Sequence, residues 1–342
     1  IPLNWSRQYR TQVEVNGLLG KVWHSMADQT LEFKRSEGTF VWLNGNGNLT
    51  GLPYLEIGDE AVIATEKIKY AHNEDEVVIE DYEAKLFYHF RFVGGTRSTY
   101  RIAKISRHQF EINFSYNASA RLEKIIDSSN RTLEIARDGE QRIVSVTHVS
   151  EVQDDKVLVE YEYNEEGFLS VIRDAIGQEE RLEYTNGLLT KKTDRNGATE
   201  HWLFENIKLE DNPKCLKHWF NKNGQQLRSF DYKLGKTVVT NAMGAKTTHW
   251  HRNGEIIQVT DAMGNSESWE YNLNGMVMRY TDKLGQHTYY GYDDYGNKTS
   301  ERLPNGGSTN YIYENNNLVA AKNAKNALWL WEYDDNGFLT RR

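Results

Sequence analysis

The sequence predicts an all-β protein built from antiparallel β-hairpins that repeat along the chain. Turn-forming glycines recur about every twenty-one residues, and aromatic residues alternate with polar ones between the turns. The composition agrees, with 20 Tyr, 12 Phe and 9 Trp beside 26 Gly and 4 Pro in 342 residues. Abundant aromatic and glycine residues with scarce proline favour strands joined by tight turns.

A first series of turns consists of an aromatic residue, a polar triplet and a glycine. Its members are Tyr163–Gly167, Trp250–Gly254, Tyr271–Gly275, Tyr292–Gly296 and Tyr333–Gly337, with a shorter form at Tyr184–Gly187, a longer one at Phe230–Gly235, and Asn in place of Gly at Tyr313–Asn317. Gly254, Gly275 and Gly296 are each 21 residues apart. This regular spacing indicates a structural unit of two strands and two turns.

A second series alternates with the first and begins with an acidic residue or Asn, followed by two residues and a glycine. It comprises Asp174–Gly177, Asp194–Gly197, Asn221–Gly224, Asn241–Gly244, Asp261–Gly264 and Asp282–Gly285, with weaker members at Asn305-Gly306 and Asn323–Asn326. Gly and Asn adopt positive φ at low cost, and a leading Asp or Asn accepts hydrogen bonds from the backbone that follows. We therefore expect the repeat residues of both series to have structural roles.

Between the turns, aromatic residues alternate with a period of two, which places each set on one face of a strand. Examples are Tyr161 with Tyr163, Trp269 with Tyr271, and Tyr290 with Tyr292. Cross-strand pairs in a stacked array stabilise it by about 0.2 to 1 kcal/mol each. Because a single hairpin is marginal in water, we expect the repeats to fold together as one long, curved sheet.

The repeats divide the sequence into three regions. Residues 161–342 hold the regular repeats, with an insertion near residues 205–217 that contains Pro213 and Cys215. Residues 101–160 contain degenerate repeats such as Asp127–Asn130 and Arg137-Asp138-Gly139. Residues 1–100 form an N-terminal β region that caps or starts the array.

Charge and composition disfavour several classes of protein. The net charge of −8 argues against a nucleic-acid partner, because such proteins usually carry a basic stripe. The single cysteine, Cys215, excludes an internal disulfide. The first ten residues lack the pattern of a secretory signal, and we expect no membrane span because no apolar run approaches eighteen residues.

The turns Tyr292-Asp293-Asp294-Tyr295-Gly296 and Tyr333-Asp334-Asp335-Asn336-Gly337 resemble the YD motif of bacterial Rhs proteins, which are related to teneurins and to the shells of Tc toxins. With the alternating D-x-x-G turns, the resemblance covers residues 115–342. The opening Pro2-Leu3-Asn4-Trp5-Ser6-Arg7-Gln8-Tyr9, then Gly17–Gly20 and Trp23-His24, is similar to the start of Rhs shells, although Lys21-Val22 departs from the expected glycine.

The resemblance implies a spiralling β-sheet that forms part of a hollow cocoon wall around a C-terminal toxin, commonly a cargo of type VI secretion in bacterial competition. The implied partners are the rest of the shell, the toxin, and a secretion-apparatus or chaperone protein. Such a polymorphic toxin is made in the bacterial cytoplasm and then secreted or delivered to target cells. The D-P-x-G motif of the family's autoprotease is absent, because none of Pro2, Pro53, Pro213 and Pro304 follows an aspartate.

Candidate sites for chemistry are few, and we predict no cofactor and no catalytic residue. His249 and His251 share a strand face and are the best, though weak, candidates for metal ligands. Cys215 with His218 is a weak nucleophile pair. Acidic pairs such as Asp293-Asp294 and Glu165-Glu166 recur at equivalent positions, which favours turn formation over acid–base catalysis.

Three functions are compatible with these features. The first is a structural wall that sequesters a toxin, and the second is a repeat module that binds carbohydrate or a cell surface through its aromatic rings. The third, an enzyme, rests on the isolated candidates above. Exposed sheet edges also predict pairing with a second copy as a homodimer.

Overall fold

The computed structural model describes residues 5–11, 16–94, 98–205, 209, 212–221, 225–334 and 337–342. Some positions used in the sequence analysis, Pro2, Leu3, Asn4, Gly224, Asp335 and Asn336, lie outside the described residues, as does part of the predicted insertion. Strand β22 (Cys215–Phe220) begins within the range predicted for that insertion.

Twenty-nine strands, β5 to β33, belong to one antiparallel sheet in which consecutive strands are hydrogen-bonded neighbours. The helical content of the described residues is one 3-10 turn, η1 (Met26–Asp28). The predicted all-β class and the long antiparallel sheet are confirmed.

The chain divides into two compact units. Unit 1 comprises Ile1–Glu60, Tyr70–Glu80 and Lys85–Leu227, and unit 2 comprises Ala61–Lys69, Asp81–Ala84 and Arg228–Arg342. Four strands have residues in both units: β8 (Glu60–Ile63), β9 (Ile68–His72), β10 (Glu76–Asp81) and β23 (Gln225–Lys233).

Unit 1 contains an N-terminal segment and most of the buried apolar side chains. The segment, residues 5–28, carries β1 (Arg7–Tyr9), β2 (Asn16–Gly17), β3 (Gly20–Lys21), β4 (Trp23–Ser25) and η1. The other strands of the unit are β5 (Thr30–Lys34), β6 (Thr39–Leu43), β7 (Leu49–Pro53), β11 (Leu86–Arg91), β12 (Thr99–Arg107), β13 (Phe110–Tyr116), β14 (Leu122–Asp127), β15 (Thr132–Arg137), β16 (Ile143–Val149), β17 (Lys156–Tyr163), β18 (Leu169–Asp174), β19 (Glu179–Thr185), β20 (Leu188–Thr193), β21 (Thr199–Phe204) and β22.

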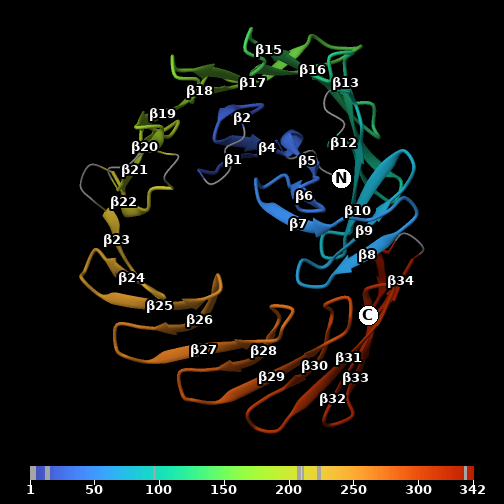
Figure 1. The fold of residues 1–342 in the computed structure, drawn as a ribbon, viewed down its shortest axis with the longest axis vertical. Coiled ribbons are helices and arrows are strands. Elements are labelled where there is room, and N and C mark those ends of the chain that lie inside the picture. Colours follow the sequence, from blue (N-terminus) through green and yellow to red (C-terminus); the bar gives the residue numbers. More distant parts are fainter. Residues whose placement is uncertain are drawn as a thin grey trace. The chain divides into compact units, whose positions relative to one another are not determined.

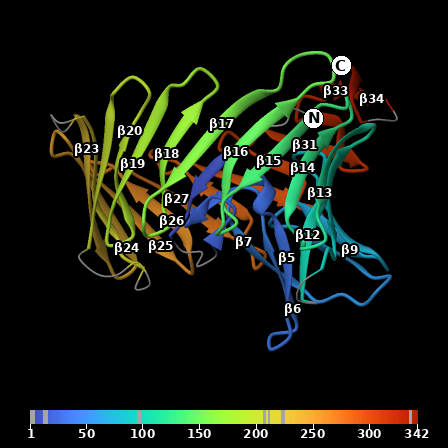
Figure 2. The same cartoon turned by 90° about the horizontal axis from the view of Figure 1, so that it is seen from above.

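Within unit 1, the N-terminal segment packs on one face of the sheet (Figure 1). Strands β17 to β20 run side by side, with hairpin turns at both edges of the sheet (Figure 2). Buried residues alternate along the strands, as Val77 and Ile79 do in β10. Alternation of this kind places one face of each strand in the core.

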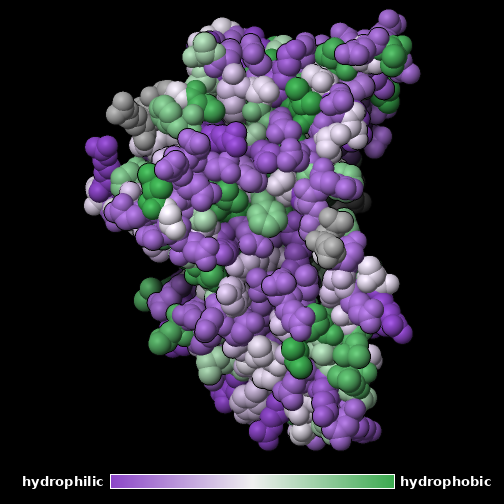
Figure 3. Space-filling view, turned by 90° about the vertical axis from the view of Figure 1, so that its right-hand side faces the viewer, coloured by the Kyte–Doolittle hydropathy of each residue, from purple (hydrophilic) through white to green (hydrophobic). Residues whose placement is uncertain are grey.

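Unit 2 continues the hairpins with few buried side chains. Its strands are β24 (Lys236–Asn241), β25 (Lys246–Arg252), β26 (Glu255–Thr260), β27 (Ser266–Tyr271), β28 (Val277–Thr281), β29 (His287–Tyr292), β30 (Lys298–Arg302), β31 (Ser308–Glu314), β32 (Asn317–Asn323), β33 (Leu328–Leu330), β34 (Glu332–Tyr333) and β35 (Leu339–Arg341). Most of its strand residues are partly exposed. The molecular face in Figure 3 is largely hydrophilic with scattered apolar side chains, in keeping with a mean hydropathy of −0.73.

Candidate functional site

One five-residue turn recurs at both edges of the sheet. In the turn that begins at Asp261, the Asp261 N–H donates to the Asn265 carbonyl at 2.9 Å, and the Gly264 N–H donates to the Asp261 carbonyl at 3.1 Å. The Asp261 Oδ1 accepts from the N–H groups of Met263 at 3.0 Å and Asn265 at 2.9 Å. Gly264 has a φ of +87°, a conformation that strongly favours glycine.

The same pair of backbone hydrogen bonds occurs in turns of both predicted series. These turns begin at Asn164, Asp174, Asp194, Asn241, Asp261, Asn272, Asp282, Asp293, Asn323 and Asp334, and upstream at Asn44, Asn117, Asp127 and Asp138. The two series therefore share one turn, which in the first series starts at the residue after the aromatic.

Several predicted turns differ in detail, and three of them illustrate how. In the turn at Asp138 the positive φ lies at Gln141 and not at Gly139, because the fourth residue of the turn takes that conformation. In Tyr313–Asn317 it lies at Asn315 and Asn316. In Trp250–Gly254, Arg252 pairs directly with Glu255, so a two-residue turn of Asn253 and Gly254 joins the strands.

In five turns of the first series, the leading tyrosine links neighbouring hairpins through its hydroxyl group. The hydroxyl donates to the carbonyl of a residue 15 positions earlier in four cases: Tyr184 to Leu169 (2.6 Å), Tyr271 to Ile256 (2.7 Å), Tyr292 to Val277 (2.9 Å) and Tyr333 to Leu318 (3.0 Å). Tyr163 donates in the same way to the Ile143 carbonyl at 2.6 Å. The aromatic position of the repeat thus fixes one hairpin against the preceding one.

The N-terminal segment is attached to the repeats by hydrogen bonds that span more than 150 residues of sequence. The Trp5 indole donates to the Tyr161 hydroxyl at 2.7 Å, and the Trp23 indole donates to the Tyr184 hydroxyl at 2.8 Å. The Leu189 N–H donates to the Tyr9 hydroxyl at 2.8 Å. Burial raises the pKa of Tyr9 to about 12, although the Leu189 bond opposes the shift.

Backbone contacts add to this attachment. The Ile143 N–H donates to the Leu18 carbonyl at 2.8 Å, and the Lys21 N–H donates to the Gly167 carbonyl at 3.3 Å. The second contact leaves no room for a side chain at Gly20, where a Cβ would lie 2.7 Å from the Gly167 oxygen.

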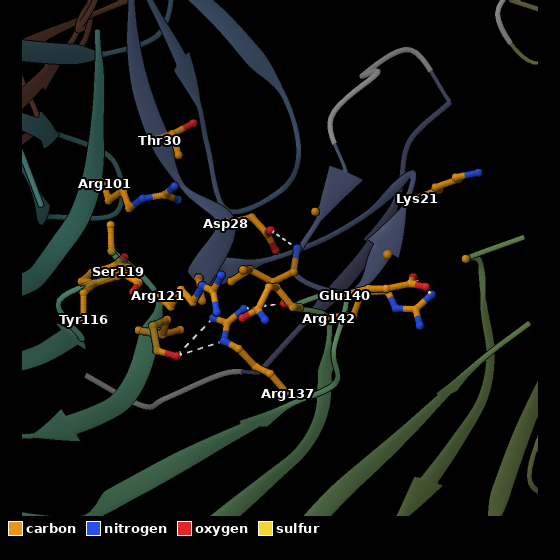
Figure 4. Close-up of a pocket in the computed structure, with 18 of the residues that line it drawn as sticks. Lys21, Asp28, Thr30, Arg101, Tyr116, Ser119, Arg121, Arg137, Glu140 and Arg142 are labelled. Carbon is orange, nitrogen blue, oxygen red and sulfur yellow. Dashed lines mark hydrogen bonds and ion pairs between the residues drawn. The ribbon is translucent and has the colours of Figure 1, made fainter. Parts of the chain in front are cut away.

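A pocket of about 710 Å³ lies between this segment and the sheet of unit 1 (Figure 4). Its lining includes Arg101 of β12, Arg121 of the turn at Asn117, Arg137 of β15 and Arg142 of the turn at Asp138. Asp28 of the N-terminal segment lies near these arginines, and Lys21 of the same segment also lines the pocket. The lining therefore combines four guanidinium groups with the carboxylates of Asp28, Glu140, Glu165 and Glu166.

Asp28 and His24 form a buried pair beside the pocket. Asp28 accepts from the Leu18 N–H at 2.5 Å, the Ser25 N–H at 2.6 Å and the Ser25 hydroxyl at 2.7 Å. Burial raises the pKa of Asp28 in spite of these bonds. Burial also lowers the pKa of His24, which is fully buried and has no hydrogen-bond partner at either ring nitrogen among the described residues.

The two histidines proposed as metal ligands lie in β25. His249 pairs with Thr237 and Val259 on the flanking strands, and His251 pairs with Ile256 after a bulge. Within the described ranges, no three residues of the types His, Cys, Asp and Glu gather closely enough to hold a metal ion.

The other chemical candidates have local partners. Cys215 pairs with Phe204 and donates from Sγ to the Lys217 carbonyl at 3.2 Å. The His218 side chain contacts the Glu200 carboxylate and not Cys215, with 2.7 Å between Nε2 and Oε1. Asp293 accepts from two backbone N–H groups of its own turn, those of Tyr295 and Asn297.

Two family models match the sequence. One, described as the teneurin YD-shell, matches residues 74–228, and a second, a domain of unknown function named DUF6531, matches residues 1–51. The chain belongs to the YD/Rhs shell family. The resemblance stated from the turns and the opening motif is therefore confirmed, and family membership supports a structural role in a shell.

Solved structures of Tc toxins align with most of this chain at low sequence identity. The Photorhabdus luminescens Tc holotoxin pore is 11% identical with a TM-score of 0.47, and the match covers 94% of this chain and 21% of that chain. The TcdB2-TccC3 complex is 10% identical with a TM-score of 0.32, covering 91% of this chain and 23% of that one. The YD/Rhs chain thus spans about a fifth of these structures. No curated protein matches its sequence.

The described part of the YD/Rhs chain contains no helix with the length and apolar character needed to cross a membrane.

Proposed function

We propose that the chain is a stretch of shell wall that encloses a C-terminal toxin and keeps it from acting on the cell that makes it. The observation that carries this proposal is the long series of hairpins in the described residues, in which turn acids and tyrosine hydroxyls bond to the backbone of their own sheet. Side chains used in this way build a barrier and are not free for catalysis. We therefore also propose a non-catalytic role for the chain and structural roles for its repeat residues.

The proposed partners follow from this role. They are the remaining wall, the enclosed toxin, a secretion-apparatus or chaperone protein, and a second copy of the chain through exposed strand edges. We further propose synthesis in the bacterial cytoplasm, followed by secretion or delivery through a type VI system in bacterial competition. The division at residues 100 and 160, with an insertion near residues 205–217, remains part of the proposal.

Protection of the enclosed segment from protease tests this proposal. The chain would be produced together with the segment that follows Arg342 in its gene, and digested beside that segment expressed alone. We expect the segment to survive inside the intact protein and to be digested when free. Equal digestion rates in the two samples would contradict enclosure.

The wall variant for this assay is Gly296→Ala, because a Cβ at Gly296 would overlap the Ala64 carbonyl. The matched control is Gly264→Ala, where a Cβ would meet no atom within 4 Å. If Gly296→Ala weakens the protection more than Gly264→Ala does, the protection depends on the folded wall.

The alternative function, a module that binds carbohydrate or a cell surface, remains a prediction. Several rings that would stack on a sugar already contact cations, since Lys236 lies 4.4 Å from the Trp250 ring and Lys298 lies 5.1 Å from the Tyr311 ring. A glycan array probed with the purified chain tests this alternative, and the absence of specific binding would eliminate it.

A further inference from the structure

Two arginines of the unit 1 pocket lack the partners that arginines normally have. Arg101 and Arg121 make no ion pair and no side-chain hydrogen bond with any residue that the structure describes. Arg142, in contrast, contacts Asp138 at 2.7 Å and Glu140 at 2.9 Å. Because Arg101 and Arg121 have no carboxylate partner of their own, their guanidinium groups are available to an anionic ligand.

A third arginine, Arg137, shares the same electrostatic environment. Its guanidinium donates to the Leu122 carbonyl at 3.1 Å and to the Gln141 carbonyl at 2.7 Å, which hold it in place without neutralising its charge. Burial lowers the pKa of Arg137, Asp28 opposes that shift, and the charges of Arg101 and Arg121 reinforce it. Figure 4 shows these arginines gathered near Asp28.

Asp28 cannot compensate all three positive charges. Its oxygens already accept three hydrogen bonds from Leu18 and Ser25. Of the other carboxylates in the lining, Glu140 pairs with Arg142, and no ion pair joins Glu165 or Glu166 to Arg101 or Arg121 among the described residues. Like charges held close together repel one another, and a bound anion reduces that repulsion.

We propose that this pocket binds a phosphate group, either as inorganic phosphate or as the phosphate of a small monoester. A phosphate dianion supplies two negative charges and accepts the paired N–H donors of arginine in a bidentate geometry. Ser119, in the same turn as Arg121, adds a hydroxyl donor to the lining. A volume of about 710 Å³ exceeds a bare phosphate and accommodates an attached organic group.

The bound phosphate stabilises the contact between the N-terminal segment and the sheet, because both line the pocket. A ligand that binds the folded state alone raises its stability as the ligand concentration exceeds the dissociation constant. This inference is independent of the proposed shell role, since a wall that encloses nothing would still bind phosphate here.

Titration calorimetry of the whole chain in phosphate-free buffer tests the inference. The probes are inorganic phosphate and glycerol 3-phosphate, compared with acetate at equal ionic strength. We expect saturable binding of one or both phosphate compounds and weaker binding of acetate. No saturable phosphate binding, or acetate binding as tight as phosphate binding, would overturn the assignment. Tighter binding of the monoester would identify an esterified ligand, and tighter binding of inorganic phosphate would identify the free anion.

The variants Arg101→Gln and Arg121→Gln link the binding to the pocket. Each should weaken phosphate binding at least about tenfold, the effect of losing a charge-assisted hydrogen bond. The control is Arg35→Gln, which removes an exposed arginine of the turn between β5 and β6. Because Arg121 is an exposed turn residue, its variant should keep the native circular dichroism spectrum. Unchanged affinity in both pocket variants, or an equal loss in Arg35→Gln, would overturn the assignment.

Discussion

Replacing Tyr184 by Phe removes one oxygen atom that joins the N-terminal segment to the repeats. The hydroxyl donates to the Leu169 carbonyl at 2.6 Å and accepts from the Trp23 indole at 2.8 Å. The ring itself stacks on Phe168, with centroids 4.9 Å apart, and this contact remains in the variant. The substitution therefore isolates the two hydrogen bonds.

The expected cost follows from what each partner loses. A typical hydrogen bond contributes about 0.5 to 1.5 kcal/mol, and leaving a buried donor without an acceptor costs about 1 to 3 kcal/mol. The Trp23 side chain is buried, so its N–H cannot turn to water instead. Tyr184→Phe should therefore destabilise the attachment of the N-terminal segment by about 2 to 4 kcal/mol.

Amide hydrogen exchange of the segment around Trp23 measures this cost locally. We expect exchange of residues 16–28 to accelerate by about thirtyfold or more, since about 1.4 kcal/mol corresponds to a factor of ten. The control is Tyr292→Phe, where the hydroxyl makes a single bond to the Val277 carbonyl at 2.9 Å. It should leave exchange of the N-terminal segment unchanged. Equal exchange in wild type and Tyr184→Phe would refute the anchoring role of the Trp23–Tyr184 bond.

Three further predictions concern the turns and the buried pair. Asp282→Ala removes the acceptor for the N–H groups of Leu284 and Gln286 and should lower the free energy of unfolding of unit 2 by about 1 to 2 kcal/mol, measured by urea denaturation. Asp282→Asn keeps an acceptor oxygen and should cost less than about 0.5 kcal/mol. Equal losses in the two variants would contradict the role of Asp282 in the turn. Gly264→Ala should lower the free energy of unfolding by about 1 to 2 kcal/mol, because alanine is strained at the positive φ of this position. Gly296→Ala should lower it by about 1 to 3 kcal/mol more, because its Cβ would overlap the Ala64 carbonyl. Thermal unfolding that ranks the two variants in the opposite order would be inconsistent with this packing. Burial lowers the pKa of His24, which faces Asp28 and Arg10, so His24 takes up a proton more readily in the unfolded state and stability is lost as pH falls below about 6.5. Wild type should therefore lose stability relative to His24→Leu between pH 7.5 and 5. Parallel stability–pH profiles of the two proteins would show that His24 does not take up a proton on unfolding.

The sequence was sufficient for the strand-and-turn pattern because that pattern is local. An Asp or Asn, two residues and a glycine specify a turn through contacts within five residues, as at Asp261. The sequence did not lead us to predict that both series form the same turn. The signal was present, because the residues that follow Tyr163 and Tyr292 are an Asn and an Asp, the same acceptors that begin the second series. The aspartate–arginine pairs at i and i+4, such as Asp138 with Arg142, are another local signal that was available.

The attachment of the N-terminal segment and the pocket could not be predicted in this way. Trp5 and Tyr161 are 156 residues apart, and Trp23 and Tyr184 are 161 apart. No periodicity within the repeats indicates which tyrosine hydroxyl receives an indole from outside them. The pocket arginines likewise come from separate strands and turns, and their proximity depends on how those strands stack.

A cryo-electron microscopy map of the chain, produced with any segment that follows Arg342 in its gene, tests the central structural claim most directly. We predict consecutive hydrogen-bonded strands with the positive-φ turn residues along both edges, curving around a hollow interior. A solid particle in which those turns lie inside helices, or are scattered among unrelated subdomains, would contradict the shell.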